Sequence, residues 1–202
     1  MTALSVLVAV VAIGAAAYAV KHIHPFAFPV WLTPLLEAPT RRLFFNRERA
    51  VERTGLAPGM RALEIGPGGG YVTEPAAARL GPTGQLVCLD VQIGMLHKVR
   101  ERLPTAAPDL VCASGSALPF RADVFDLVFM VAVFGEIPDK RGAVREYARV
   151  LRPRGILAVT EHLPDPDYTR SSTLCRVIAP LGFTPERCLG GWVHYTYRFT
   201  RT

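Results

Sequence analysis

Three glycines at alternate positions, Gly66, Gly68 and Gly70, directly follow a short apolar run of residues. Glycine lets the backbone approach a ligand closely, so this spacing predicts a loop that wraps a small molecule. Glu64 lies near the end of that run, and a second apolar run ends in Asp90, twenty residues after Gly70. A carboxylate in the position of Asp90 can accept hydrogen bonds from both hydroxyls of a ribose. The spacing therefore predicts a site for a cofactor that contains a nucleoside.

The form of the glycine loop argues against a nicotinamide dinucleotide. Such a site uses G-x-G-x-x-G, and Tyr71 stands where the third glycine would be. A nicotinamide-dependent oxidoreductase is therefore the weakest alternative. Saturable binding of NADH in a titration would support it.

Further polar groups follow the later apolar runs, where open α/β sheets bind their ligands. Glu136 could take a proton from a substrate, or it could cap the turn before Pro138. His162 could act as a base beside Glu161. A metal site is disfavoured because these groups lie on a proline-rich loop. We expect Glu136 and His162 to be catalytic, and the candidates for substrate contact are Phe134, Glu161, Tyr168 and Arg41.

The elements that must position these groups alternate between strands and helices. Short runs rich in Val, Leu and Ile predict strands, which are separated by stretches with helical spacing. The expected strands are 61–65, 85–90, 109–113, 125–131 and 155–160, with helices over 71–80, 95–103 and 141–151 and a final hairpin of 183–188 and 193–200. This alternation predicts a parallel sheet covered by helices on both faces.

The pattern Glu64-x-Gly66-x-Gly68-x-Gly70 resembles the first motif of the class I S-adenosylmethionine-dependent methyltransferases, E/D-x-G-x-G-x-G. Leu118-Pro119-Phe120, Phe125-Asp126 and the V-L-R-P-R-G of residues 150–155 resemble later blocks of that family. The resemblance is to the methyltransferase type 11 kind, which includes ubiquinone and menaquinone C-methyltransferases, and it covers residues 50–202. It implies a Rossmann-like, doubly wound, seven-stranded and mostly parallel sheet closed by a C-terminal antiparallel hairpin.

This resemblance implies S-adenosyl-L-methionine as cofactor and S-adenosyl-L-homocysteine as product. The residues implied to contact the cofactor are Glu64, Gly66, Gly68, Gly70, Tyr71, Asp90, Val91, Ser114, Gly115 and Ser116. Ser114 departs from the family pattern, because it stands where an acid usually meets the adenine amino group. A hydroxyl accepts that hydrogen bond more weakly, so the departure concerns adenine affinity and not cofactor identity.

The first forty residues lie outside the resemblance. Residues 1–20 carry no charge, and 3–20 as a helix would span about 27 Å, close to the hydrocarbon core of about 30 Å. We expect a transmembrane anchor over 1–20 and a proline- and aromatic-rich interfacial segment over 21–46, ahead of a methyltransferase domain over 47–202.

The flanking charges predict the orientation of this anchor. Lys21, Arg41 and Arg42 all lie on its carboxyl side, so the positive-inside rule puts the catalytic domain in the cytoplasm of a single-pass membrane protein. A cleaved signal peptide is the alternative because Ala17-Tyr18-Ala19 fits a cleavage pattern, although the positively charged start of such a peptide is missing.

The amino-acid composition further limits the classes of protein to which the chain can belong. A chain of 202 residues suits one domain, and its net charge of +6 leaves an acidic middle between basic flanks. A basic flank beside an apolar segment suits an anionic bilayer, whereas the basic run over 140–154 lacks the interleaved aromatics of a nucleic-acid site. The cysteines, Cys88, Cys112, Cys175 and Cys188, show no metal spacing, so we expect reduced and buried thiols.

The leading hypothesis is a membrane-anchored methyltransferase with a lipophilic acceptor, either a phospholipid amine or a quinone precursor. One alternative is a small soluble or thiol acceptor. Another is a cofactor-binding pseudo-enzyme that acts as a membrane-recruited interaction protein, with Ser114 and Gly135 as signs of lost activity. The acceptor atom and the oligomeric state stay open at this point.

Overall fold

The computed structural model describes residues 45–104, 108–163 and 165–202. One seven-stranded sheet runs through this part of the chain in the order β3-β2-β1-β4-β5-β7-β6. Strands β1 to β5 pair in parallel, while β7 pairs antiparallel with both β5 and β6. The expected Rossmann-like α/β fold with a closing antiparallel hairpin is confirmed.

The strands are β1 (Arg61–Ile65), β2 (Gln85–Asp90), β3 (Asp109–Cys112), β4 (Phe125–Val131), β5 (Leu151–His162), β6 (Phe183–Gly190) and β7 (His194–Arg201). The α-helices are α4 (Arg47–Thr54), α5 (Thr73–Leu80), α6 (Ile93–Arg102), α7 (Lys140–Val150) and α8 (Ser171–Ile178). The described residues also form two short 3₁₀ helices, η2 (Phe134–Glu136) and η3 (Ala179–Leu181).

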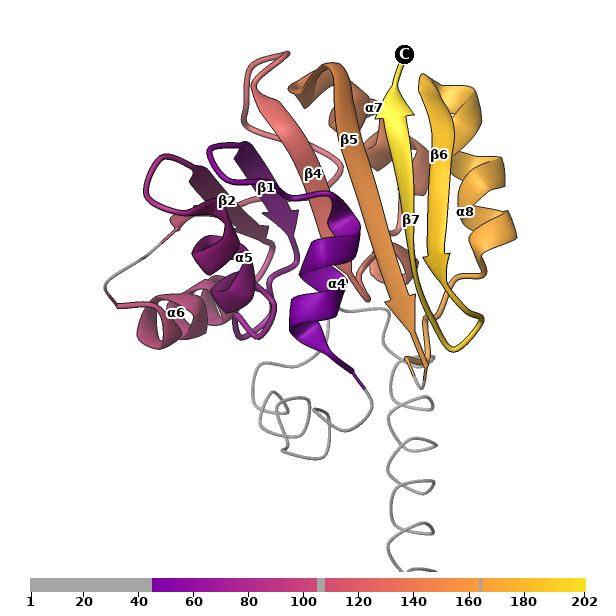
Figure 1. Cartoon of the computed structure of the whole chain (residues 1–202). Coiled ribbons are helices and arrows are strands. Elements are labelled where there is room, and N and C mark those ends of the chain that lie inside the picture. The colour runs from indigo at the N-terminus through magenta and orange to yellow at the C-terminus, as the bar shows by residue number, and fades with distance from the viewer. Residues whose placement is uncertain (1–44, 105–107, 164) are drawn as a thin grey trace, which may run out of the picture.

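Helices cover both faces of the sheet, with α4 and α5 on one side and α7 and α8 on the other (Figure 1). The hydrophobic core therefore consists of two clusters, one on each face of the sheet. Leu63, Val128 and Tyr147 belong to the cluster on the α7 side, and Ala62, Leu127 and Phe45 belong to the cluster on the α4 side. Successive residues of a strand alternate between these clusters, because side chains in a strand point to opposite faces.

The central strands β1, β2 and β4 have the bounds that the apolar runs predict. Strand β5 is longer than expected and contains an irregularity. Phe125 pairs with Leu151 and Leu127 pairs with Ile156, so four residues of β5 bulge out against one of β4. Arg154 in this bulge has a φ of 66°. Helices α4 and α8 were not expected from the sequence, and each is only 8 residues long.

Part of the N-terminal prediction lies outside the described residues: the anchor over 1–20, most of the interfacial segment over 21–46, and Arg41. In the part of the chain that the structure describes, no helix has both the length and the apolar character that a membrane span requires.

All four cysteines are free thiols. The expectation of burial holds for Cys88 and is wrong for Cys112 and Cys188, which are exposed, while Cys175 is half-buried. Cys112 and Cys188 belong to β3 and β6, the two edge strands of the sheet, which have a neighbouring strand on one side only.

Candidate active site

The loop between β1 and α5 holds the three alternate glycines in positive φ, at 65° for Gly66, 55° for Gly68 and 83° for Gly70. A side chain at Gly66 would lie 2.6 Å from Cγ2 of Val133, so this position packs too closely for any other residue. A Cβ at Gly68 would meet nothing within 4 Å. The loop is therefore fixed against β4 at Gly66 and open at Gly68, where a ligand can approach the backbone.

Two arginines hold the carbonyl groups of this loop. Arg102 of α6 donates to the Gly69 carbonyl at 2.9 Å, and Arg47 of α4 donates to the Tyr71 carbonyl at 3.3 Å. Arg47 also forms an ion pair with Glu74 at 2.7 Å. The Tyr71 ring is buried beneath the Arg47 guanidinium, 5.1 Å from the ring centre. Tyr71 thus holds the loop in place from the core side.

Glu64 lies at the end of β1 with only 2% of its surface exposed. The Cys88 thiol donates to its Oε2 at 3.5 Å. Burial raises the pKa of Glu64 to about 7, against the opposing effects of Thr73 and Cys88. This group therefore changes its charge near neutral pH, and a cation close to it would favour the ionised form.

Asp90 ends β2 and is also buried. Its Oδ1 accepts a hydrogen bond from the Gln92 amide at 2.9 Å, which holds the turn that leads into α6. Burial raises the pKa of Asp90, the backbone N–H groups of Gln92, Gly68 and Val91 lower it, and the charge of Glu136 raises it. The neighbouring Val91 is 55% exposed and offers an apolar surface beside the carboxylate.

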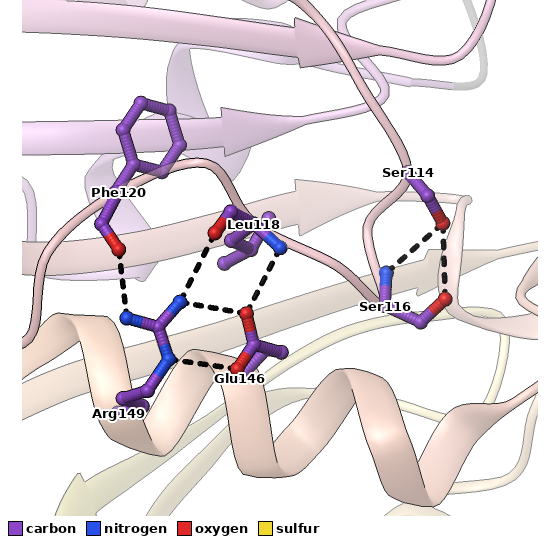
Figure 2. Close-up of polar contacts among 6 residues, drawn as sticks. All are labelled: Ser114, Ser116, Leu118, Phe120, Glu146 and Arg149. Carbon is purple, nitrogen blue, oxygen red and sulfur yellow. Dashed lines mark hydrogen bonds and ion pairs between the residues drawn. The ribbon is translucent and has the colours of Figure 1, made fainter.

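Ser114 and Ser116 lie beyond the end of β3. Their hydroxyls are 2.9 Å apart, and the Ser116 amide is 3.3 Å from the Ser114 hydroxyl (Figure 2). Gly115 lies between them, and a side chain there would come within 3.1 Å of the buried Tyr147 hydroxyl. The two serines are thus held together by local hydrogen bonds that occupy the Ser114 oxygen.

An ion pair on α7 fixes the segment that follows these serines (Figure 2). Glu146 accepts from the Leu118 amide at 2.9 Å, and Arg149 donates to the carbonyls of Leu118 and Phe120 at 3.0 Å and 2.7 Å. Arg149 also binds Glu146, with both distances at 2.7 Å. Because Leu118–Phe120 connects β3 to β4, this ion pair sets the position of one wall of the site.

Two carboxylates lie at the carboxyl ends of neighbouring strands, with Glu136 after β4 and Glu161 as the penultimate residue of β5. Glu136 belongs to η2 and is half-exposed, whereas Glu161 is 1% exposed. The Thr169 amide donates to Glu161 Oε2 at 3.2 Å, and Oε1 is buried with no hydrogen-bond partner in the described chain. Burial raises the pKa of Glu161 to about 8, and Asp165 and Glu136 add to this effect. Glu136 thus lies close enough to interact with both Glu161 and Asp90.

Gly135 brings the loops after β4 and β5 into contact. A side chain on Gly135 would lie 2.0 Å from the carbonyl oxygen of Asp167. Lys140 donates to the carbonyls of Gly135 at 2.9 Å and Ile137 at 2.8 Å, which holds η2 in place. A glycine is therefore required here for packing, so Gly135 is not a sign of lost activity.

The remaining candidate residues, His162, Phe134 and Tyr168, have surroundings that differ from those of Glu136 and Glu161. His162 lies on the α4 face of the sheet, with its ring centre 4.6 Å from that of Phe45, away from Glu161. The Phe134 side chain is fully buried in the core. The Tyr168 hydroxyl donates to the Trp192 carbonyl at 2.6 Å. Among the described residues, no group of three His, Cys, Asp or Glu side chains has a metal-binding arrangement.

Comparison with known proteins finds methyltransferases that are similar to part of this chain. Residues 63–159 match the family model described as a methyltransferase domain. The chain is 36% identical over 115 residues to the ubiquinone/menaquinone biosynthesis C-methyltransferase UbiE of Ectopseudomonas mendocina. The aligned region covers 55% of this chain and 45% of that protein. The chain is 34% identical over 134 residues to UbiE of Pseudomonas savastanoi pv. phaseolicola, which covers 64% and 52%. The chain thus spans about half the length of these curated relatives.

The fold is also found in solved structures. An S-adenosylmethionine-dependent methyltransferase from Aquifex aeolicus superposes with a TM-score of 0.79 at 20% identity, over 87% of this chain and 100% of that one. This likeness supports the fold, while the family model and the UbiE relatives support the class of enzyme. Together these matches support an S-adenosylmethionine-dependent methyltransferase with S-adenosylmethionine as its cofactor.

Proposed function

We propose that this chain transfers a methyl group to a ring carbon of a lipophilic, quinone-type acceptor. The observation that carries the proposal is Glu161, a buried carboxyl group with a pKa of about 8 and an oxygen without a hydrogen-bond partner in the described chain. Glu161 lies near Glu136 at the carboxyl ends of β5 and β4. The names of the UbiE relatives, which are C-methyltransferases of quinone biosynthesis, support the acceptor class.

The glycine loop over residues 66–70, Glu64 and the segment 90–93 that begins at the end of β2 together form what we call the cofactor cradle. Its residues fit the cofactor. S-adenosylmethionine is a cation at its sulfonium and its ammonium, and the buried carboxyl groups of Glu64 and Asp90 supply the opposite charge. The open backbone at Gly68 leaves room for the amino acid part, and the exposed Val91 offers an apolar contact for the base. When bound, the cofactor supplies an electrophilic methyl group.

The protein's task is then to align the acceptor and to move a proton. A phenolic ring carbon becomes a better nucleophile when the ring hydroxyl loses its proton. A base whose pKa is about 8 accepts that proton more readily than an ordinary carboxylate, because its pKa is closer to that of a phenol, about 10. We assign this role to Glu161, and we assign to Glu136 the task of raising the pKa of Glu161 at the mouth of the site. The ring hydrogen at the methylated carbon leaves as a proton afterwards.

Transfer of a labelled methyl group tests the proposal. The full-length chain is incubated with labelled S-adenosylmethionine and total membrane lipid, with the Asp90→Ala variant as control. We expect label in an extractable quinone-type lipid, identified by its mass, and none with the variant. Label found only in phospholipid headgroups or in soluble thiols would overturn the acceptor class. Cofactor binding without transfer to any extract would favour the pseudo-enzyme.

We also propose that residues 1–20 anchor the chain in the membrane with the domain on the cytoplasmic side. The uncharged run and the positive charges that follow it support this proposal. A chain that lacks residues 1–20 should keep its cofactor affinity and no longer sediment with membranes through this segment. In high salt, which weakens electrostatic contacts with lipid, sedimentation of this truncated chain equal to that of the full chain would contradict the anchor.

A further inference from the structure

Four large hydrophobic side chains are exposed among the described residues: Val91, Ile93, Trp192 and Val193. Val91 and Ile93 follow β2 beside Asp90, so they belong to the cofactor cradle. Trp192 is 77% exposed and Val193 is 45% exposed, and both lie in the turn between β6 and β7. The methyltransferase site does not account for this second pair, which we call the hairpin tip.

The backbone of the hairpin tip is held in one conformation by close packing and a hydrogen bond. Gly190 has a φ of 109°, and a side chain on it would lie 2.3 Å from the His194 carbonyl oxygen. The Gly191 amide donates to that same carbonyl at 3.0 Å. Because the backbone is held on both sides of the tip, Trp192 is presented to solvent in a defined position.

Hydrogen bonds connect the tip to the loop that follows β5. The Leu163 amide donates to the Val193 carbonyl at 2.8 Å, and the Tyr168 hydroxyl donates to the Trp192 carbonyl at 2.6 Å. The arrowheads of β1, β4 and β5 point to the lower edge of the sheet in Figure 1, and the turn between β6 and β7 lies at the same edge. The tip therefore lies on the edge where the cofactor cradle opens, next to the loop after Glu161.

Arginines flank the tip. The Arg53 Nη1 atom lies 2.9 Å from the place of a Cβ on Gly190, and the charges of Arg53 and Arg49 add to burial in lowering the pKa of His194. Arg170 is exposed at the end of the loop after β5. Within the described ranges, none of these three arginines forms an ion pair with a carboxylate.

We propose that the hairpin tip docks onto an anionic bilayer surface. Tryptophan favours the boundary between headgroups and acyl chains, and arginines beside it meet lipid phosphates. Docking there turns the open edge of the sheet, with the cradle and the loop after β5, toward the lipid. This contact does not depend on methyl transfer, so it can be measured without turnover.

The fluorescence of Trp192 tests the docking in the full chain. The chain has two tryptophans, Trp31 and Trp192, so the Trp31→Phe variant leaves Trp192 as the reporter. This variant is mixed with vesicles of phosphatidylglycerol and phosphatidylcholine that carry bromine on the acyl chains. We expect a shift of the emission to shorter wavelength and at least twofold quenching. Exchange of Arg53 and Arg170 for Gln, or addition of high salt, should reverse most of the quenching.

A matched reporter at the other end of β6 serves as control. In a chain with Trp31→Phe, Trp192→Phe and Thr184→Trp, the exposed residue 184 should stay unquenched on the same vesicles. If the chain sediments with the vesicles while Trp192 remains unquenched, the proposal is overturned. The same holds if the Trp192 emission shifts without lipid as protein concentration rises, because the tip would then contact a second copy of the chain.

Discussion

Glu161 and His162 are adjacent in β5 but point to opposite faces of the sheet. Glu161 stands opposite Tyr195 in the register of β5 and β7, on the side of α7 and α8, and His162 stands opposite His194, beneath Phe45. The alternation of side chains along a strand imposes this separation. The two groups therefore have different neighbours, and Glu136 affects the pKa of Glu161.

This separation predicts unequal effects of two substitutions. Glu161→Gln should lower kcat by about 100-fold or more, the range for loss of a general base, while cofactor affinity is kept. His162→Gln should change kcat by less than about threefold, and it serves as the matched control. Because burial raises the pKa of Glu161 to about 8, the wild-type rate should rise as pH increases toward 9. Equal losses in both variants, or a rate independent of pH in the wild type, would exclude Glu161 as the base.

Glu64 makes cofactor affinity depend on pH. Burial raises its pKa to about 7, so the group is mostly protonated below that pH. A bound cation favours the ionised form, and binding must then release a proton. We expect affinity for S-adenosylmethionine to fall up to about tenfold per pH unit below 7, measured by calorimetry in two buffers of different ionisation enthalpy. The Glu64→Gln variant should bind more weakly and without this dependence.

The same group affects stability in the free protein. Its folded pKa of about 7 lies above the ordinary value of 4.5, so its contribution is fully present at acid pH and is lost as pH rises from about 4.5 to about 7. The loss amounts to about 3 kcal/mol. The Glu64→Gln variant should therefore become more stable relative to wild type as pH rises from 5 to 8, which the free energies of unfolding of the two proteins measure. A difference that stays constant over this range would contradict the assignment.

The ion pair on α7 offers a test of the wall that it holds. Arg149→Met removes two hydrogen bonds to the Leu118–Phe120 segment and the ion pair with Glu146, so we expect a loss of about 1–2 kcal/mol in stability and weaker binding of S-adenosylhomocysteine. Arg145→Met, on an exposed position of the same helix, is the control and should match wild type. Thermal unfolding and calorimetry measure the two effects, and equal behaviour of the variants would refute the role of this ion pair.

Gly135 tests the contact between the loops after β4 and β5. A methyl group there would collide with the Asp167 carbonyl, and we expect Gly135→Ala to cost about 1–3 kcal/mol of stability. Acceptor turnover should fall more than cofactor affinity does, because the glycine loop is not involved. Gly191→Ala, where a side chain would meet nothing within 4 Å, should be close to neutral in stability. A stable, fully active Gly135→Ala chain would contradict the packing argument.

The sequence predicts the central strands because they are buried on both faces. Residues 61–65, 85–90 and 125–131 are short runs in which apolar residues predominate and nearly every position is buried, which is the pattern of parallel strands under two layers of helices. The glycine loop is equally predictable, since alternate glycines leave few other interpretations. The helices α4 and α8 escape detection because two turns of helix carry too few apolar positions to establish a period. The equally short α5 is predictable because it lies between two predicted strands and Gly81-Pro82 marks its end.

What the sequence could not predict depends on contacts between distant residues. Arg47 and Arg102 hold the glycine loop from α4 and α6, and no spacing in the chain marks them for this task. Phe134 was expected to face the substrate because it follows β4, but the 3₁₀ turn directs its ring into the core. Two polar residues that are adjacent in a strand, such as Glu161 and His162, are a weak indication of a shared site, because adjacent side chains point to opposite faces of the sheet.

The close contact of Gly135 with Asp167 has a consequence for engineering. At Gly135 the segment after β4 contacts the segment after β5, and the Asp167 backbone occupies the space that a side chain on residue 135 would need. A graft of only one of these segments from a relative with a different acceptor should therefore leave a collision or a void. Exchange of both segments as a unit, together with Lys140, is the design that the packing allows.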